Sequence, residues 1–254
     1  MRLLQPTDKW AVVDLETDGL YDEATKVHCI VVRFPDGRAE AFHDDPSVTP
    51  RAGSVAEGAH LVAWLDHVVM HNGVGFDVPI LKKLCGVDVS LDRLFDTIVT
   101  SRLLWPEIAP FDFERVKRGQ MPGKQVGSHS LKAWGFRLGV HKGDFADQDD
   151  WSTFSQEMLD YCVQDTAVTL ALFQHLHSQS LDERSVDLEH RFAATLEAQA
   201  RGGFAFNEKK AQELTGSLIG QRSELMQRLG SAFPPFVDHY ETPKRREKKT
   251  RTTP

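Results

Sequence analysis

Short apolar runs, each bounded by turn-forming residues, mark the first third of the chain. Runs of this length that are rich in Val and Ile are typical of buried strands. The turn sequence PDG at residues 35–37 joins two of these runs as a hairpin. The pattern therefore predicts strands at residues 9–15, 27–34, 38–43 and 68–72.

Farther along the chain, apolar residues recur every three or four positions, which is the period of a helix with one buried face. The segment 107–130 is rich in Pro, Gly and basic residues and is predicted to be a loop. Strands followed by a mixture of helices favour an α/β sheet of about five strands with helices packed on it. The predicted helices are 54–67, 78–84, 97–105, 131–138, 155–178, 182–200 and 207–231.

The composition, 41% hydrophobic and 26% charged, is that of an ordinary globular protein. The longest apolar run falls far short of the roughly 18 residues that a membrane span requires. The first ten residues lack the apolar core of a signal peptide. Three widely separated cysteines favour a reducing compartment over a disulfide framework. We therefore expect a cytoplasmic protein that does not associate with membranes.

The formal net charge of −7 is unlike that of proteins that hold duplex DNA with their whole surface. The charge is unevenly distributed, because residues 244–254 contain six Lys/Arg and one Glu. We interpret this segment as part of a flexible, solvated basic tail, and contact with nucleic acid is the alternative.

Acidic residues occur at the ends of several predicted elements. Asp14 and Glu16 are two residues apart on the first strand, so their side chains share one face of it. Asp77 follows the strand at 68–72 and begins a helix, where the helix dipole alone would account for it. Tyr161 and Asp165 are four residues apart and share one face of the helix at 155–178. Each piece by itself is a weak signal.

Together, in the order D-x-E, N-x4-D and Y-x3-D, these residues resemble the DEDDy branch of the DnaQ-like 3'–5' exonucleases. The sister branch has a histidine where this sequence has Asp160, which places the sequence in the tyrosine branch. The resemblance is closest to the proofreading domains of phage T7-like family A DNA polymerases. It is carried by DLET (14–17), HNGVGFDVPIL (71–81), LFDTIVTSRLL (94–104), MPGKQVGSHSLKAWGFRLGVHKGDF (121–145), MLDYCVQD (158–165), VDLEHR (186–191) and GGFAFNEKKAQEL (202–214).

The resemblance implies a ribonuclease H-like fold, a mixed five-stranded sheet with flanking helices, followed by C-terminal helices. It implies three parts: an exonuclease domain at 1–180, a helical segment at 181–235 that leads into the polymerase domain in family A polymerases, and a basic tail at 236–254. The chain is too short to contain a polymerase active site as well. Two explanations of this length fit equally: a fragment of a longer polymerase, or a separate exonuclease subunit.

The resemblance also implies a catalytic site with two divalent cations, Mg²⁺ or Mn²⁺. Their ligands would be Asp14, Glu16, Asp77 and Asp165, and the Tyr161 hydroxyl would orient the attacking water. Hard cations prefer oxygen ligands, which explains the carboxylates. Clustered carboxylates repel one another, so we expect a raised pKa in the metal-free protein.

Further residues match substrate-side positions of the family. Thr17 and Leu20 would contact the 3'-terminal nucleotide, and Asn72 and Phe76 would lie on the same side, although each could simply line a turn. Lys124 belongs to a basic stripe with Arg115, Lys117 and Arg118 that would guide a single strand, with plain solvation as the alternative. Asp96 is expected to cap the helix that begins at Thr97.

The sequence thus predicts a metal-dependent 3'–5' exonuclease that acts on the 3' ends of single-stranded DNA and proofreads in phage DNA replication. Its partner would be a polymerase domain, in the same chain or as a separate subunit. Two alternatives remain: an RNA 3'-exonuclease of the ribonuclease D type, and a non-catalytic DnaQ-like scaffold module.

Overall fold

The computed structural model describes residues 8–140 and 151–234. The chain divides into two compact units, Met1–Gly202 and Gly203–Pro254. The basic tail predicted at 236–254 lies outside the described residues. The domain boundary expected after residue 180 stays a prediction.

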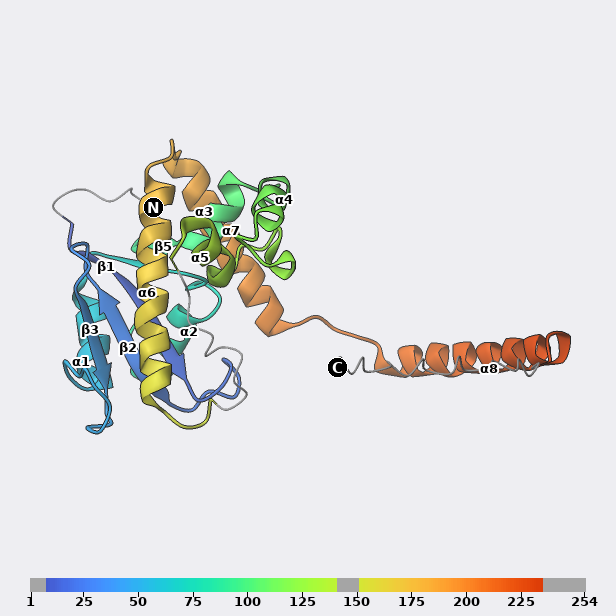
Figure 1. Cartoon of the computed structure of the whole chain (residues 1–254). Coiled ribbons are helices and arrows are strands. Elements are labelled where there is room, and N and C mark those ends of the chain that lie inside the picture. The colour runs from blue at the N-terminus through green and yellow to red at the C-terminus, as the bar shows by residue number, and fades with distance from the viewer. Residues whose placement is uncertain (1–7, 141–150, 235–254) are drawn as a thin grey trace, which may run out of the picture. The chain divides into compact units, whose positions relative to one another are not determined.

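The first unit is built on one mixed sheet of five strands in the order β3-β2-β1-β4-β5 (Figure 1). β1 pairs antiparallel with β2 and parallel with β4, so the sheet changes direction beside its central strand. This confirms the mixed five-stranded sheet. The strand bounds are β1 Trp10–Thr17, β2 Val27–Arg33, β3 Ala39–His43, β4 His67–Met70 and β5 Leu94–Asp96.

The two faces of the sheet are covered by different helices, because alternate residues of each strand point to opposite sides. On the first face, Ala11, Val13 and Leu15 of β1 belong to a core that includes Val62 of helix α1. On the second face, Val12 belongs to a core formed largely by the long helix α6 (Figure 1). We call this second side the α6 face.

The helices of the first unit largely follow the predicted pattern. Ser54, Ser130 and Ser155 each cap the helix that follows by accepting a backbone N–H in its first turn. The bounds are α1 Val55–Trp64, α2 Asp77–Ile80, α3 Thr97–Leu104, α4 Ala109–Lys117, α5 Leu131–Leu138, α6 Gln156–His177 and α7 Glu183–Gly202.

Three predicted elements differ in extent or type from those of the structure. The segment 107–130 is not a continuous loop, since Ala109–Lys117 forms α4. Pro110 suggested a loop, but proline is well tolerated in the first turn of a helix. The helix expected over 54–67 ends at Trp64, and His67 already begins β4. The helix expected over 78–84 is a short α-helix that continues as a π-helical turn at Leu81–Cys85.

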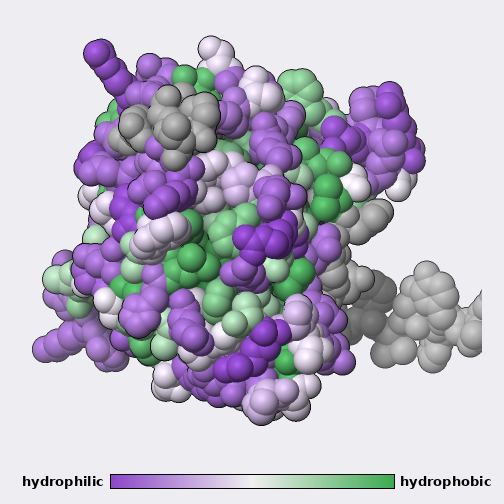
Figure 2. All heavy atoms as spheres, turned by 90° about the vertical axis from the view of Figure 1, so that its left-hand side faces the viewer, coloured by the Kyte–Doolittle hydropathy of each residue, from purple (hydrophilic) through white to green (hydrophobic). Residues whose placement is uncertain are grey.

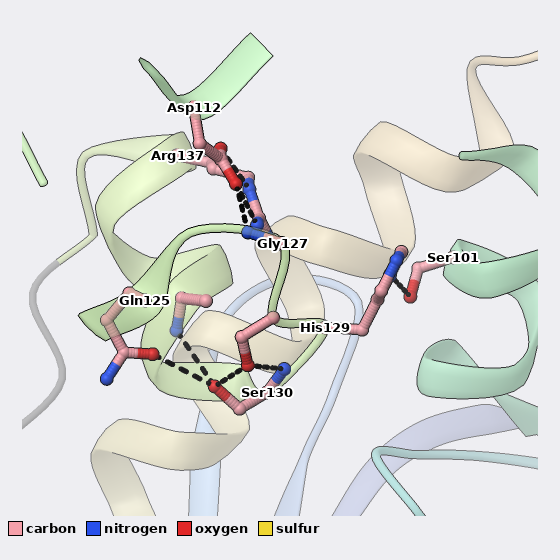
Figure 3. Close-up of polar contacts among 9 residues, drawn as sticks. Ser101, Asp112, Gln125, Gly127, His129, Ser130 and Arg137 are labelled. Carbon is pink, nitrogen blue, oxygen red and sulfur yellow. Dashed lines mark hydrogen bonds and ion pairs between the residues drawn. The ribbon is translucent and has the colours of Figure 1, made fainter. Parts of the chain in front are cut away.

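A buried ion pair holds α4 against α5. Arg137 donates to both carboxylate oxygens of Asp112 at 2.9 and 2.7 Å, and the backbone N–H of Gly127 donates to the same carboxylate at 3.0 Å (Figure 3). In the same loop, His129 lies within hydrogen-bond distance of Ser101 in α3, 3.0 Å from its hydroxyl. These contacts order the segment between the two helices.

The second unit contributes helix α8, Glu208–Ala232, which begins at the cap residue Asn207. Its Asn207 side chain accepts the backbone N–H of Lys210 at 2.9 Å. No residue of α8 is buried in the described part of the chain.

Figure 2 shows the side of the molecule that lies on the left in Figure 1, where α1 and β3 are found. Hydrophilic side chains cover most of this side, and hydrophobic side chains gather near its centre. Such a mixture is usual for the surface of a folded domain.

Among residues 8–140 and 151–234, none of the helices has the length and low polarity needed to cross a bilayer.

Candidate active site

The first strand delivers two carboxylates to the α6 face of the sheet. Asp14 and Glu16 lie opposite Val31 and Cys29 of β2, and residues directly opposite each other in a sheet share a face. Val31 and Cys29 pack with Cys162 of α6. The shared face expected for the two carboxylates is therefore the one that α6 covers.

A tight loop after β4 brings in the third acid. Because β1 and β4 are parallel, their carboxyl ends meet at the same edge of the sheet. Asp77 begins α2 directly after this loop and is buried, 3% exposed. Asn72 adopts φ 67°, a left-handed conformation that asparagine tolerates better than most residues. Its backbone N–H and that of Val74 donate to the Asp96 carboxylate at 3.0 and 2.9 Å.

Asp96 has a larger role than the expected helix cap. It accepts the N–H of Ile98 at 3.0 Å as a cap residue, and two further backbone donors come from the loop that precedes Asp77. The structure therefore makes Asp96 the anchor of that loop as well as the cap of α3.

Helix α6 supplies the remaining residues from one of its faces. Tyr161 and Asp165 are both buried, at 8% and 6% exposed. Cys162 lies between them and donates its thiol hydrogen to Asp14 Oδ2 at 3.3 Å. Ligand atoms of Asp14, Glu16 and Cys162 all lie within 4.8 Å of one another, close enough for one metal ion.

The acids lie close enough to shift one another's pKa values. Burial raises the pKa of Glu16 well above its ordinary value, and the negative charges of Asp14, Asp165 and Asp77 raise it further. Burial also raises the pKa of Asp77, with Asp14 as the next cause. A carboxylate that lies beside other carboxylates is easier to protonate, because protonation removes a repulsive charge.

The Tyr161 hydroxyl and the Cys162 thiol are held in their protonated forms. Burial raises the pKa of Tyr161 far above its ordinary value, with Asp165 and Glu16 as further causes. Burial likewise raises the pKa of the Cys162 thiol. Cys162 therefore acts as a hydrogen-bond donor to Asp14 rather than as a thiolate.

A pocket of about 540 Å³ opens beside Glu16. Four of the predicted substrate-side residues, Thr17, Leu20, Asn72 and Phe76, line it. Leu20 is 74% exposed, which is a large exposure for an aliphatic side chain. Lys124 does not line this pocket and is exposed on the short 3₁₀-helix Gly123–Gln125. The full lining is Glu16, Thr17, Gly19, Leu20, Glu23, Asn72, Gly75, Phe76 and Trp151.

Sequence reasoning missed two residues of the site. Trp151 lines the pocket and meets Tyr161 edge-on, with ring centroids 6.1 Å apart, while its carbonyl lies 3.0 Å from His28 Nε2. No periodic pattern marked Trp151, because it precedes α6 in an irregular segment. Cys162 could have been found, since it lies three residues before Asp165 on the same helical face.

Known proteins resemble this chain in sequence over most of its length. A family model described as 3'–5' exonuclease matches residues 9–180, more than half of the chain. The DNA-directed DNA polymerase of Escherichia phage T7 is 34% identical over 87% of this chain and 37% of its own length. That of Enterobacteria phage T3 is 33% identical over the same shares. The chain thus spans a little over a third of the length of the curated relatives it matches.

The fold agrees as well. NrnC of Brucella melitensis superimposes with a TM-score of 0.52 at 17% identity, covering 80% of this chain and 89% of that chain. This likeness confirms the expected ribonuclease H-like arrangement of the sheet and its helices.

Proposed function

The chain belongs to the 3'–5' exonuclease family of family A DNA polymerases, and we propose that it proofreads DNA by removing nucleotides from single-stranded 3' ends. The observation that carries the proposal is the convergence of acids from β1, α2 and α6 at one edge of the sheet, beside an open pocket. The proposed catalytic residues are Asp14, Glu16, Asp77, Tyr161 and Asp165.

The donor set of this site fits hard divalent cations. Four carboxylates offer oxygen ligands of the kind that Mg²⁺ and Mn²⁺ prefer. The raised pKa values of Glu16 and Asp77 are what closely spaced acids show when no cation offsets their charge. The Cys162 thiol is a soft donor that stays protonated, so we leave it out of the ligand set. Asp14, Glu16, Asp77 and Asp165 would hold two cations, and the chemistry that such cations would supply is activation of water and neutralisation of charge on the phosphate.

The other residues position the reactants. Tyr161 keeps its proton, because its pKa is raised, so its hydroxyl orients the attacking water by hydrogen bonding and is not a base. Leu20, Phe76 and Trp151 offer apolar surface to the terminal base, in the way that single strands are usually held. Thr17 and Asn72 add polar groups at the same pocket. Lys124, exposed near the other residues of the basic stripe, would attract the strand from outside the pocket.

A digestion assay tests the activity. The full chain is incubated with 5'-labelled single-stranded DNA, and with RNA of the same sequence, in Mg²⁺, in Mn²⁺ and in EDTA. We expect stepwise loss of 3' nucleotides from DNA that depends on metal and is abolished in Asp14→Asn/Glu16→Gln. Undiminished digestion by that variant would refute the proposed site. A strong preference for RNA would refute the proposed substrate and favour the ribonuclease D alternative.

The proposed partner is a polymerase domain, in the same chain or as a separate subunit. The support is that the two phage relatives extend well beyond the part that this chain matches. The intact mass of the native protein distinguishes the arrangements, since a single long product would contain both parts.

A further inference from the structure

Helix α7 contacts the nucleotide pocket from outside the exonuclease segment. It spans Glu183–Gly202, beyond the residues 9–180 that the family model matches. The same compact unit contains it, and it packs against α3. One of its side chains contacts the backbone of the pocket directly, and a second contacts Asp96, which anchors the loop that carries that backbone.

The first contact is made by Arg201 near the end of α7. Its Nη2 donates to the backbone oxygen of Gly75 at 3.0 Å. Gly75 lines the pocket and is packed closely, because a Cβ added there would lie 2.8 Å from Asn72 Oδ1. Arg201 therefore fixes the loop that presents Asn72 and Phe76 to the pocket.

The same guanidinium also contacts the loop after β1, which carries Leu20. Its Cζ lies 4.7 Å from the centroid of the Tyr21 ring. Tyr21 directly follows Leu20, the exposed apolar residue of the pocket. The Tyr21 backbone is fixed separately by Lys83, whose Nζ donates to the Tyr21 oxygen at 2.6 Å. One arginine thus joins the loop after β1 to the loop after β4, the two walls between which a 3' end would lie.

The second contact is made by His190, which lies eleven residues before Arg201 on α7. It accepts the backbone N–H of Asp96 at 2.7 Å and donates from Nδ1 to the Val186 oxygen at 2.8 Å. Asp96 in turn accepts the N–H groups of Asn72 and Val74. The loop after β4 is therefore linked to α7 twice, directly through Arg201 and indirectly through Asp96 and His190.

A plain surface role does not account for Arg201. Its carboxylate neighbour on the helix, Glu197, lies 3.7 Å away, a looser contact than the one with Gly75. Arg191, one of the arginines on the same helix, shows what a surface role looks like. It pairs with Asp187 and Asp92 and has a side chain that is 54% exposed, against 31% for Arg201.

We propose that Arg201 is a positioning residue for the 3'-terminal nucleotide, and that it sets the spacing between the Leu20 and Asn72 walls of the pocket. The proposal rests on the proposed function of the pocket. It makes the helix that follows the matched exonuclease segment part of substrate binding.

The test measures binding and turnover separately. The full-length variants Arg201→Ala, Arg201→Lys and Tyr21→Leu are compared with Arg191→Ala as the matched control. Affinity for a fluorescent single-stranded oligonucleotide is measured by anisotropy in EDTA, and kcat and KM are measured with Mg²⁺. We expect Arg201→Ala and Tyr21→Leu each to weaken binding and raise KM about tenfold, with kcat at saturation within about twofold of wild type.

Two further results follow if both residues act through one contact. Arg201→Lys keeps the charge but loses the planar fork, so it should recover part of the affinity. The double variant Arg201→Ala/Tyr21→Leu should lose less than the sum of the two single losses, because both single changes remove the Arg201–Tyr21 contact. Each single change also removes a contact of its own, with Gly75 for Arg201 and with Lys83, whose Nζ lies 5.1 Å from the ring centroid, for Tyr21. Arg191→Ala should match wild type.

Unchanged affinity and KM in Arg201→Ala and in Tyr21→Leu would overturn the proposal, as would additive losses in the double variant. If Arg201→Ala fails to fold, Tyr21→Leu and Arg201→Lys decide the matter by the same criterion. A wild-type chain that digests no substrate would contradict the proposed function instead, and the binding measurement in EDTA would still test Arg201.

Discussion

The first unit contains one buried carboxylate, Asp112, and a partly buried cluster of carboxylates, and the two have opposite electrostatic surroundings. Burial by itself would raise the pKa of Asp112, but hydrogen bonds from Arg137 and Gly127 outweigh it, and the pKa lies below its ordinary value (Figure 3). At the edge of the sheet, burial raises the pKa values of Glu16 and Asp77, and the neighbouring carboxylates raise them further.

The difference separates a structural acid from the acids of the proposed catalytic site. Asp112 has its counter-charge in the same chain, where a bidentate arginine satisfies both oxygens. Glu16 is surrounded by Asp14, Asp165 and Asp77, an arrangement that destabilises the metal-free protein. Clustered acids of this kind become favourable once a cation binds, which is why strongly shifted groups tend to mark functional sites.

The sharpest test of the comparison is to neutralise one acid of the cluster and, separately, to remove the arginine partner of Asp112. Asp14→Asn should reduce the rate of nucleotide release by about a thousandfold or more, because a ligand is lost where the metals supply several kcal/mol of transition-state stabilisation. Its melting temperature in EDTA should be no lower than that of wild type. Steady-state digestion and thermal melting measure the two quantities, and near-normal digestion would contradict the assignment.

Breaking the ion pair between Arg137 and Asp112 should lower stability and leave activity nearly unchanged. Arg137→Met leaves Asp112 buried beside no guanidinium and should lower the free energy of unfolding by about 3–5 kcal/mol, as removal of one partner of a buried ion pair usually does. Urea unfolding measures this loss. The double variant Arg137→Met/Asp112→Leu should recover part of it, and kcat per folded molecule should change little in both.

Tyr161 should show an intermediate effect. Tyr161→Phe removes the hydroxyl but keeps the ring that meets Trp151, so we expect kcat to fall about 10–100-fold, as for partners that orient a metal site. Stability should stay close to wild type. The pKa of Tyr161 is raised, so its hydroxyl should stay protonated throughout the pH range of the assay. The pH dependence of kcat in Tyr161→Phe should therefore have the same shape at alkaline pH as in wild type. A changed shape there would assign Tyr161 a role as base.

The smallest expected effect concerns the stability of the metal-free protein. The pKa of Glu16 is higher in the folded than in the unfolded state. Between these two values the folded state binds more protons, so the free energy of unfolding falls as pH rises. Glu16→Gln should weaken this fall and raise the melting temperature in EDTA at neutral pH by a few degrees.

Melting curves from pH 5 to pH 8 in EDTA measure this dependence. Added Mg²⁺ should stabilise wild type and should have much less effect on Glu16→Gln. The matched control is Asp112→Asn. In wild type the folded pKa of Asp112 is depressed, so the stability that Asp112 contributes is lost as pH falls, which is the opposite direction from Glu16. The same pH dependence in Glu16→Gln as in wild type would contradict the argument.

Local patterns predicted most of the elements of the first unit. Uninterrupted apolar runs marked β1, β2 and β4, since these strands are buried on both faces. They missed β5, Leu94–Asp96, because three residues are too few for a pattern. They also missed α4, because Pro110 resembles a loop residue until its place in the first helical turn is known.

The residues of the site also fall into those that the sequence predicted and those that it missed. The acids and Tyr161 were recognisable because their combined order and spacing resemble those of a known exonuclease family, although each pair by itself was a weak signal. Trp151 and Arg201 were not, since what brings them to the pocket is the packing of elements far apart in the chain. Lys124 is the opposite case, because the sequence predicted it as a substrate-side residue and it does not line the pocket beside Glu16.

The sequence by itself determined which residues carry acidic chemistry and which elements present them, because faces and periods are local properties of the backbone. Only the tertiary structure decided that Cys162 donates to Asp14, that Arg137 neutralises Asp112 and that Arg201 joins the two walls of the pocket. Each of these contacts depends on the order of strands in the sheet and on how helices pack over it, which no local pattern specifies.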